Sequence, residues 1–238
     1  MFGTPPVRAL FFEFPDEPEL FDVSTQFLIG RDVLVTPVLI PNATTVNGAS
    51  GVPQVRRILI KQPLNKGIFP GRANVIWRDW YTHDIVDYES GAATTLTAPL
   101  GHINVHVRDR SAILLHASPA YTIEETRQGP FSLLISQSVD GYAFGSAYID
   151  DGVTYPPTPS KTLTFSVTRS QVVIATHGSF NVTQRLRDIT ILGVSAEPSF
   201  VFVDGKEITK WYYVASKCKL VAQSLNIDLN IRVKVYWE

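Results

Sequence analysis

The sequence predicts a mainly β protein that contains two antiparallel β-sandwich domains. From Val33 to the C-terminus, short segments rich in Val, Ile, Thr and aromatic residues alternate with turns that contain Gly, Pro, Asn and Asp. This spacing is typical of β-sandwiches. Helical periodicity is scarce, and 45% of the 238 residues are hydrophobic, so the chain has enough apolar residues for a substantial core.

The first thirty residues show a different pattern. The segment Val7–Phe14, VRALFFEF, is a nearly continuous apolar run, which predicts a strand buried on both faces. After a loop, Asp22 or Ser24 is expected to cap a short helix through Leu28, and Gly30 ends that helix. A buried strand of this kind has no pairing partner in the sequence, which indicates a further domain that lies mostly outside the chain.

The remaining predicted elements are strands bounded by turn residues. Asp204 and Gly205 in the segment VDGK predict a type I′ hairpin turn, because both residue types accept the positive φ angles of this turn. A boundary at 117–121 divides the strands between two domains. The predicted strands cover residues 33–40, 74–88, 94–100, 103–109, 111–117, 131–138, 141–150, 161–170, 171–180, 187–194, 199–205, 211–216, 218–224 and 231–238.

Composition excludes several classes of function. The net charge of −1 lacks the basic excess of proteins that bind nucleic acid or anionic membranes. Cys218 is the only cysteine, so no internal disulfide framework is possible, and we expect this thiol to be buried and unreactive. No apolar run is long enough for a membrane span, and the N-terminus lacks the features of a signal peptide. The sequence predicts no cofactor, no metal and no nucleic-acid or membrane partner.

The segment Gly48–Gly67 differs from its surroundings, because it contains four basic residues and no acidic residue. One interpretation is a basic binding loop. The other, which we favour, is a surface insertion of the kind that loop tips of β domains tolerate. We expect a poorly ordered loop whose deletion leaves the fold intact.

Two sequons, at Asn42 and Asn181, match the acceptor pattern for N-linked glycosylation on the secretory route. Three aromatic residues close together, Trp77, Trp80 and Tyr81, offer flat apolar faces on which a sugar ring can stack. The simpler interpretation, that these rings pack in a core, is favoured over a stacking platform.

Seven motifs follow one another along the chain. They are PVRALFFEFP, STQFLIGRDVLVTPVL, FPG followed by W and DWYTH, APLGHINVHVRDRSAIL, PAYTIEETR, GSAYIDDG and ITILGV. Together they resemble the C-terminal third of the family 31 glycoside hydrolases, in particular fungal α-glucosidases. The resemblance extends from about Thr4 to Trp237, with the exception of the segment Gly48–Gly67.

This resemblance implies a domain organisation. Residues 1–30 would be the last strand and last helix of a TIM barrel, residues 31–118 a proximal β-sandwich with an insertion at 48–67, and residues 119–238 a distal β-sandwich. It also implies that the complete enzyme hydrolyses terminal α-linked glucose by a retaining mechanism. That mechanism needs two carboxyl groups about 5–5.5 Å apart. The family carries both on earlier barrel strands, so we expect no catalytic residue and no activity in this chain.

The resemblance has two departures. Family members usually lack the segment Gly48–Gly67, which has the features of a translated intron or of a loop specific to one lineage. They also usually have two glycines where Asp109 and Arg110 stand here. If those glycines adopt positive φ, each replacement costs about 1–2 kcal/mol.

Several residues have the chemical groups of a catalytic or metal site but not the spacing or position that such a site needs. Asp150 and Asp151 are adjacent, so on a strand they would point to opposite faces, and a turn is the better interpretation. His102 and His106 would share a strand face at a separation of about 13 Å, which is too far for joint metal binding. Glu13 lies near the end of the predicted barrel strand, and we expect no catalytic role for it.

The complete enzyme is expected to bind α-glucosides and to be secreted or located in the cell wall or vacuole. The alternative is a stand-alone carbohydrate-binding or structural β-sandwich protein. Without a barrel, the apolar side chains near the N-terminus would lack neighbours. We therefore expect residues 1–21 to be loosely packed or to drive self-association.

Overall fold

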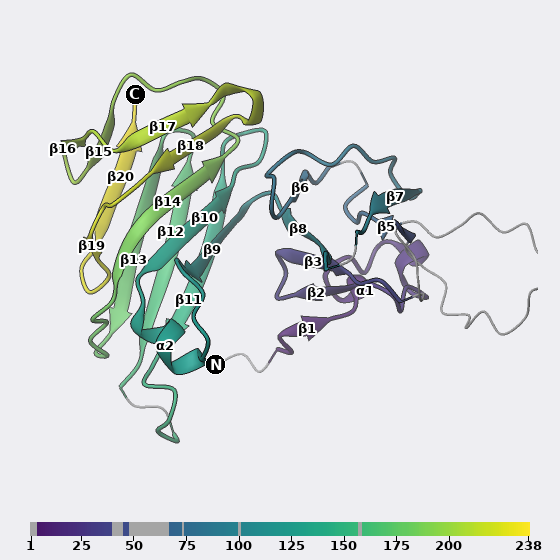
Figure 1. Ribbon diagram of the computed structural model, residues 1–238, viewed down its shortest axis with the longest axis horizontal. Coiled ribbons are helices and arrows are strands. Elements are labelled where there is room, and N and C mark those ends of the chain that lie inside the picture. The colour runs from purple at the N-terminus through teal and green to yellow at the C-terminus, as the bar shows by residue number, and fades with distance from the viewer. Residues whose placement is uncertain (1–3, 40–44, 48–66, 73, 100, 157–158) are drawn as a thin grey trace, which may run out of the picture. The chain divides into compact units, whose positions relative to one another are not determined.

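The computed structural model describes residues 4–39, 45–47, 67–72, 74–99, 101–156 and 159–238 (Figure 1). It confirms that the protein is mainly β. The chain divides into two compact units, Met1–Asp109 (unit 1) and Arg110–Glu238 (unit 2). The expected insertion at 48–67, apart from Gly67, and the sequon at Asn42 lie outside the described residues.

Unit 1 contains antiparallel sheets. Within its described residues, one sheet has the strand order β1-β2-β3-β8-β6 and a smaller one has the order β4-β7-β5. Its elements are β1 (Val7–Arg8), α1 (Leu10–Glu13), a 3₁₀ helix (Pro18–Leu20), β2 (Phe27–Ile29), β3 (Val33–Thr36), β4 (Thr45–Asn47), β5 (Gly67–Ile68), β6 (Trp77–Asp79), β7 (Ala93–Thr97) and β8 (Asn104–Arg108).

The predicted buried strand Val7–Phe14 is wrong. Only Val7–Arg8 is a strand, and Leu10–Glu13 forms one turn of α-helix. Leu10 and Phe14 are buried, whereas Phe11 and Phe12 between them are exposed. A spacing of four residues between buried positions is that of a helix face, which the continuous apolar run concealed.

The predicted helix through Leu28 is also wrong. Phe27–Ile29 is strand β2, and Ile29 pairs with Val33 of β3. Gly30 has a φ of 61° and turns the chain between these two strands. It therefore ends a strand and not a helix.

Side chains between residues 4 and 30 are part of the core of unit 1. Leu10, Leu20 and Leu28 have no exposed surface, and they pack in one cluster with Phe69 and Trp77. This packing contradicts the expectation that residues 1–21 are loosely attached. Self-association through that segment stays a prediction.

Unit 2 is built on one large sheet. Its strand order among the described residues is β16-β15-β20-β13-β12-β11-β9-β10-β14-β18-β17, with β19 beside β14. The elements are β9 (Ser111–His116), α2 (Ile123–Gln128), β10 (Phe131–Ser136), β11 (Ala143–Ile149), β12 (Lys161–Thr168), β13 (Gln171–Gly178), β14 (Arg185–Leu192), β15 (Val201–Val203), β16 (Lys206–Ile208), β17 (Trp211–Val214), a 3₁₀ helix (Ala215–Lys217), β18 (Lys219–Ala222), β19 (Ile227–Asp228) and β20 (Val233–Trp237).

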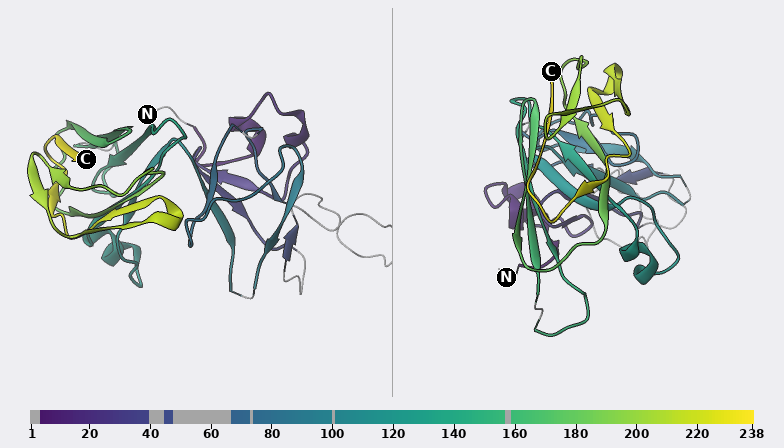
Figure 2. Two further views of the ribbon diagram at one scale, coloured as in Figure 1. Left: turned by 90° about the horizontal axis from the view of Figure 1, so that it is seen from above. Right: turned by 90° about the vertical axis from the view of Figure 1, so that its left-hand side faces the viewer.

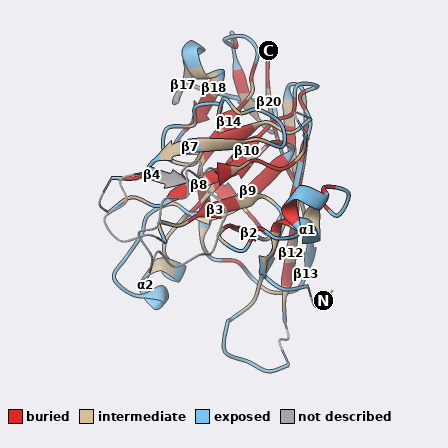
Figure 3. Ribbon diagram, turned by 90° about the vertical axis from the view of Figure 1, so that its right-hand side faces the viewer, coloured by how far each residue is buried: buried red, intermediate tan, exposed pale blue. Residues whose placement is uncertain are grey.

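The sheet of unit 2 is mixed, so the wholly antiparallel arrangement expected here is wrong. Strand β10 pairs with β14 in parallel, and β11 makes a short parallel pairing with β9. The long connection from β10 through β13 makes the parallel return possible. The sheet curls until it nearly closes, as the views of Figure 2 show. Buried residues concentrate on strands such as β10 and β14, while α2 lies on the surface (Figure 3).

The connection between the units has an unusual backbone. The division falls before Arg110, where we expected it after residue 118, because β9 pairs with β10 along its whole length. Arg110 has a φ of 59°, and Asp109 does not have a positive φ. Of the two positions where the family has glycine, only Arg110 therefore carries this strain. The assignment of the units to a barrel remnant, a proximal and a distal sandwich stays a prediction.

Candidate functional site

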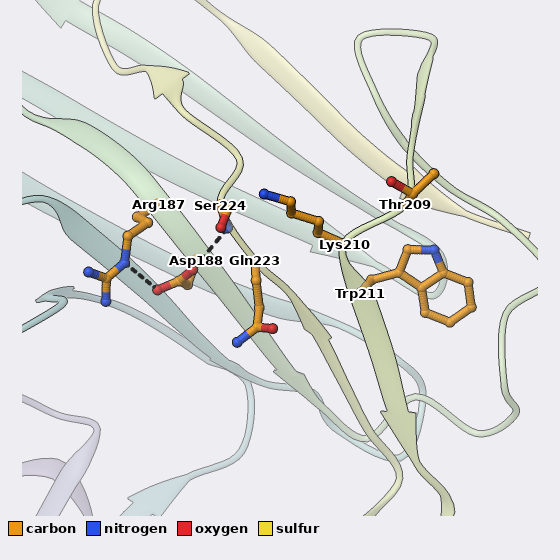
Figure 4. Close-up of a pocket in the computed structure, with 7 residues that line it drawn as sticks. All are labelled: Arg187, Asp188, Thr209, Lys210, Trp211, Gln223 and Ser224. Carbon is orange, nitrogen blue, oxygen red and sulfur yellow. Dashed lines mark hydrogen bonds and ion pairs between the residues drawn. The ribbon is translucent and has the colours of Figure 1, made fainter.

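A polar hollow of about 500 Å³ lies on unit 2 where β14, β17 and β18 meet (Figure 4). The pairing of Ile189 with Ala222 and of Trp211 with Ala222 brings the three strands together. The lining residues are Arg187, Asp188, Thr209, Lys210, Trp211, Gln223 and Ser224. Sequence reasoning missed this site, because its residues come from three separate segments and form no local motif.

The carboxylate of Asp188 is held in place on both sides. Arg187 Nε donates a hydrogen bond to Asp188 Oδ2 at 2.7 Å, and the Ser224 backbone N–H donates to Oδ1 at 3.1 Å. The Gln223 N–H donates to the Lys210 carbonyl at 2.8 Å, which joins the other two segments. Trp211 packs partly against the core of unit 2. The hollow is therefore a fixed surface lined by hydrogen-bonding groups.

This arrangement does not support glycoside hydrolysis. Among the described residues that line the hollow, Asp188 is the only carboxylate, and retaining hydrolysis needs two. No group of three or more His, Cys, Asp or Glu side chains in the described part of the chain is arranged to hold a metal ion. No helix within the same residues is long and apolar enough to cross a membrane.

The three aromatic residues predicted for sugar stacking do not share one surface. Trp77 has no exposed surface, and its Nε1 donates to the Pro70 carbonyl at 2.8 Å in the core of unit 1. Trp80 is half-buried, whereas Tyr81 is 53% exposed. The Tyr81 ring lies 4.8 Å from that of His102. Trp77 is thus a core residue, and a stacking role stays a prediction for Trp80 and Tyr81 alone.

His102 and His106 have separate surroundings. The ring of His106 packs edge-on against Phe69 at 4.9 Å, while His102 contacts Tyr81. Burial lowers the pKa of His106 to about 4, although the nearby Asp79 opposes this effect. His106 is therefore a neutral core residue at physiological pH.

The remaining carboxylates from the sequence analysis serve structure. Glu13 accepts a hydrogen bond from Arg8 within the first turn of unit 1. Asp151 accepts hydrogen bonds from the Thr154 side chain and from the N–H groups of Thr154 and Val153, which lower its pKa to about 2. The interpretation of Asp150–Asp151 as a turn is confirmed.

The prediction of a buried Cys218 is wrong, because this residue is exposed. It follows the 3₁₀ helix at Ala215–Lys217 with a φ of 46°, and this left-handed turn leaves its side chain at the surface.

Asn181 is also exposed. Its glycosylation stays a prediction, as does that of Asn42, which lies outside the described residues.

The comparisons with known proteins agree on one family. Residues 3–50 match the glycosyl hydrolase family 31 C-terminal domain. An α-glucosidase of Schizosaccharomyces pombe is 37% identical over 211 residues, which are 89% of this chain and 20% of that protein. The α-glucosidase of Aspergillus niger is 38% identical over 207 residues, which are 87% of this chain and 19% of that protein.

Solved structures with the same fold belong to larger proteins. The glucosidase II α subunit with α3-Glc2 bound matches with a TM-score of 0.79 and 19% identity, over 99% of this chain and 26% of that one. A Flavobacterium johnsoniae dextranase complexed with glucose matches with a TM-score of 0.70 and 19% identity, over 99% of this chain and 29% of that one.

The fold and the sequence thus define a two-unit β region like the C-terminal region of family 31 glycoside hydrolases. The chain corresponds to the C-terminal region of the family 31 α-glucosidases. It spans about 20% of the length of the curated relatives that it matches.

Proposed function

We propose that the chain is the C-terminal accessory region of an α-glucosidase that hydrolyses terminal α-linked glucose with retention. The observation that supports this most strongly is the extent of the similarity to the S. pombe α-glucosidase, which covers 89% of this chain and therefore includes both units. An accessory domain that had acquired an unrelated role would not need to keep this similarity along its whole length.

In this role the chain stabilises a catalytic domain and does not perform the chemistry. A retaining glycosidase needs two carboxyl groups, an acid/base and a nucleophile, that face one substrate. The described candidates are engaged elsewhere: Glu13 with Arg8, Asp151 with its own turn, and Asp188 with Arg187. The complete protein is proposed to act on α-glucosides in a secreted, cell-wall or vacuolar location, where Asn181 is a site for a glycan.

A second function is a carbohydrate-binding β protein without catalysis of its own. The hollow around Asp188 favours it, because its lining offers amide, hydroxyl and charged groups that bond to sugar hydroxyls. The two functions are compatible when the binding region belongs to a larger hydrolase.

The proposal is tested with purified chain and nitrophenyl α-glucoside as the chromogenic substrate. We expect no turnover, and the complete A. niger relative serves as the positive control. Turnover that disappears in Asp188→Asn or Glu13→Gln would contradict the accessory role, because it would place a catalytic carboxylate in this chain. Turnover that persists in both variants would contradict it as well.

A further inference from the structure

The outer face of the sheet in unit 2 has an unusual composition. Strands β11, β12, β13, β20 and β15 are neighbours in the sheet, and their residues alternate between a buried inner row and an outward row. The outward residues in register are Phe144, Ser146 and Tyr148; Thr162, Thr164, Ser166 and Thr168; Gln171, Val173, Ala175 and His177; Lys234 and Tyr236; and Phe202. We call this set the aromatic face.

Aromatic rings occupy both sides of this face. On β11, Phe144 is 47% exposed and Tyr148 is 45% exposed. On the other side, the rings of Phe202 and Tyr236 stack at 4.8 Å, with Lys234 Nζ 5.0 Å above the Tyr236 ring. Phe144 and Tyr148 are about 13 Å apart along the strand, and β11 is about 19 Å from β15 across the sheet. The rings therefore border an extended surface on the outside of the curled sheet.

Hydroxyl groups fill the space between the rings. Ser166 pairs with Phe144, Thr164 with Ser146 and Thr162 with Tyr148. Within these five strands none of the outward residues is a carboxylate, and Lys234 is the only lysine or arginine among them. The nearest carboxylate in register is Glu207 of the edge strand β16, which pairs with Phe202 at the border of the face. A solvated sheet face is expected to be polar and commonly carries charged side chains, so this face is suited to contact an uncharged ligand.

We propose that the aromatic face binds a neutral α-glucan chain as a surface site that is separate from catalysis. Aromatic faces stack on the apolar faces of pyranose rings, and the Ser and Thr hydroxyls donate to and accept from sugar hydroxyls. A polyanion is disfavoured, because one lysine supplies too little positive charge. A protein partner would be expected to meet more aliphatic surface than Val173 and Ala175 provide. The choice of an α-linked glucan rests on the proposed function.

The site differs from the hollow around Asp188. That hollow has one indole, which packs partly against the core, and its carboxylate is already engaged by Arg187 and Ser224. The aromatic face instead offers exposed rings on a sheet whose inner row is fixed in the core, including Phe165 and Val235. A rigid scaffold beneath the rings lowers the entropy cost of binding.

The test is affinity electrophoresis of the complete chain in native gels that contain either soluble starch or dextran. We expect at least one polymer to retard the chain. The double variant Phe144→Ala/Tyr148→Ala should lose about tenfold in affinity, the loss expected for two stacking contacts. Ser146→Glu should lose binding as well, because it places a charge between the two rings without removing any packing.

Two matched variants control for nonspecific effects. Tyr212→Ala removes a tyrosine that is also 45% exposed, but on the edge strand β17, and Ser195→Glu adds a charge at an exposed loop position. Both are expected to bind like the unaltered chain. Circular dichroism checks that each variant is folded. If the double variant is unfolded, the loss of glucan binding is judged from Ser146→Glu alone.

Three results would overturn the proposal. The first is no retardation by either polymer, and the second is equal loss in the Tyr212→Ala control. The third is a dimer in light scattering that becomes a monomer in the double variant, because the face would then be an interface between copies. Turnover of the chromogenic glucoside by the isolated chain would refute the accessory role instead, so the two failures are distinguishable.

Discussion

The side-chain amide of Gln26 hydrogen-bonds to both backbone groups of Ile68, 42 positions away. Its Oε1 accepts from the Ile68 N–H at 2.9 Å, and its Nε2 donates to the Ile68 carbonyl at 3.3 Å and to Thr36 Oγ1 at 2.9 Å. Gln26 is buried, so it substitutes for a neighbouring strand beside β5. A second hydrogen bond joins the same two parts of the chain, because the Gly71 N–H donates to the Glu17 carboxylate at 2.9 Å. The N-terminal segment is therefore joined to the sheets of unit 1.

Replacing Gln26 with Ala should destabilise unit 1 by about 2–4 kcal/mol. The substitution leaves the part-buried N–H and carbonyl of Ile68 and the buried Thr36 hydroxyl without these partners, and each buried group left unpaired costs about 1–3 kcal/mol. Denaturant unfolding followed by tryptophan fluorescence measures the change, because Trp77 lies in this core. Ser24→Ala, at an exposed position in the same segment, should have little effect. Equal stability of the two variants would show that the Gln26 bonds contribute nothing.

Removal of residues 1–21 should abolish the cooperative unfolding of unit 1 while unit 2 still melts. The deletion removes the buried side chains of Leu10, Phe14 and Leu20, each of which contributes about 1.5–3 kcal/mol when fully buried. Calorimetry of both forms measures the transitions. This outcome is the reverse of the one expected from the sequence, and an unchanged melting profile would restore that earlier expectation.

Two neighbouring substitutions test the burial of the N-terminal segment without a deletion. Leu20→Ala should cost about 2–5 kcal/mol, because it opens a cavity in the core. Phe21→Ala removes a larger side chain that is 53% exposed, and it should cost much less. If the Phe21 variant were the less stable of the two, the described packing of this segment would be incorrect.

Arg110→Gly should stabilise the protein by about 0.5–1 kcal/mol. Glycine relieves the left-handed strain at a φ of 59°, and the greater entropy of its unfolded chain offsets part of the gain. The matched change Arg232→Gly, at an exposed position without positive φ, should destabilise instead. Thermal melting of both variants gives the sign of each effect. A loss of stability in Arg110→Gly would mean that the arginine side chain contributes more than the strain costs.

His106 should make unit 1 less stable as the pH falls. Its pKa is near 4 in the folded protein, mainly because of burial, and 6.5 in the reference state. Between these values the unfolded chain binds more protons, so stability is complete above pH 6.5 and is lost as the pH falls toward 4, by about 3 kcal/mol. The difference between the unaltered chain and His106→Gln in unfolding free energy, measured from pH 4 to 7, isolates this effect. A difference that does not change with pH for His106→Gln would contradict the burial of this ring.

Local signals in the sequence were sufficient where the structure is local. The Asp204–Gly205 turn joins β15 and β16 with φ angles of 48° and 80°, as its residue types predict. Strand β12 and its neighbours have the expected alternation. The segment Val7–Phe14 failed, because an unbroken apolar run carries no period, and only its neighbours decide which side chains are buried.

The candidate sites also differ in whether local sequence or distant strand pairing forms them. The turn at Asp151 was predictable, because its hydrogen bonds reach no further than Thr154. The hollow around Asp188 was not, since Lys210 and Gln223 join it through strand pairing. The aromatic face needs the register of five strands, which no single segment encodes. Exposure of Cys218 depends on one left-handed residue that the sequence does not mark.

The most direct test of the accessory role is a chimera. The C-terminal fifth of the S. pombe α-glucosidase, to which this chain is 37% identical, is replaced by this chain, and kcat/KM is measured on a chromogenic α-glucoside. The truncated relative should be inactive, and the chimera should recover hydrolysis, as should a control chimera with the A. niger C-terminal region. Activity in the control chimera together with none in the chimera of this chain would contradict the account.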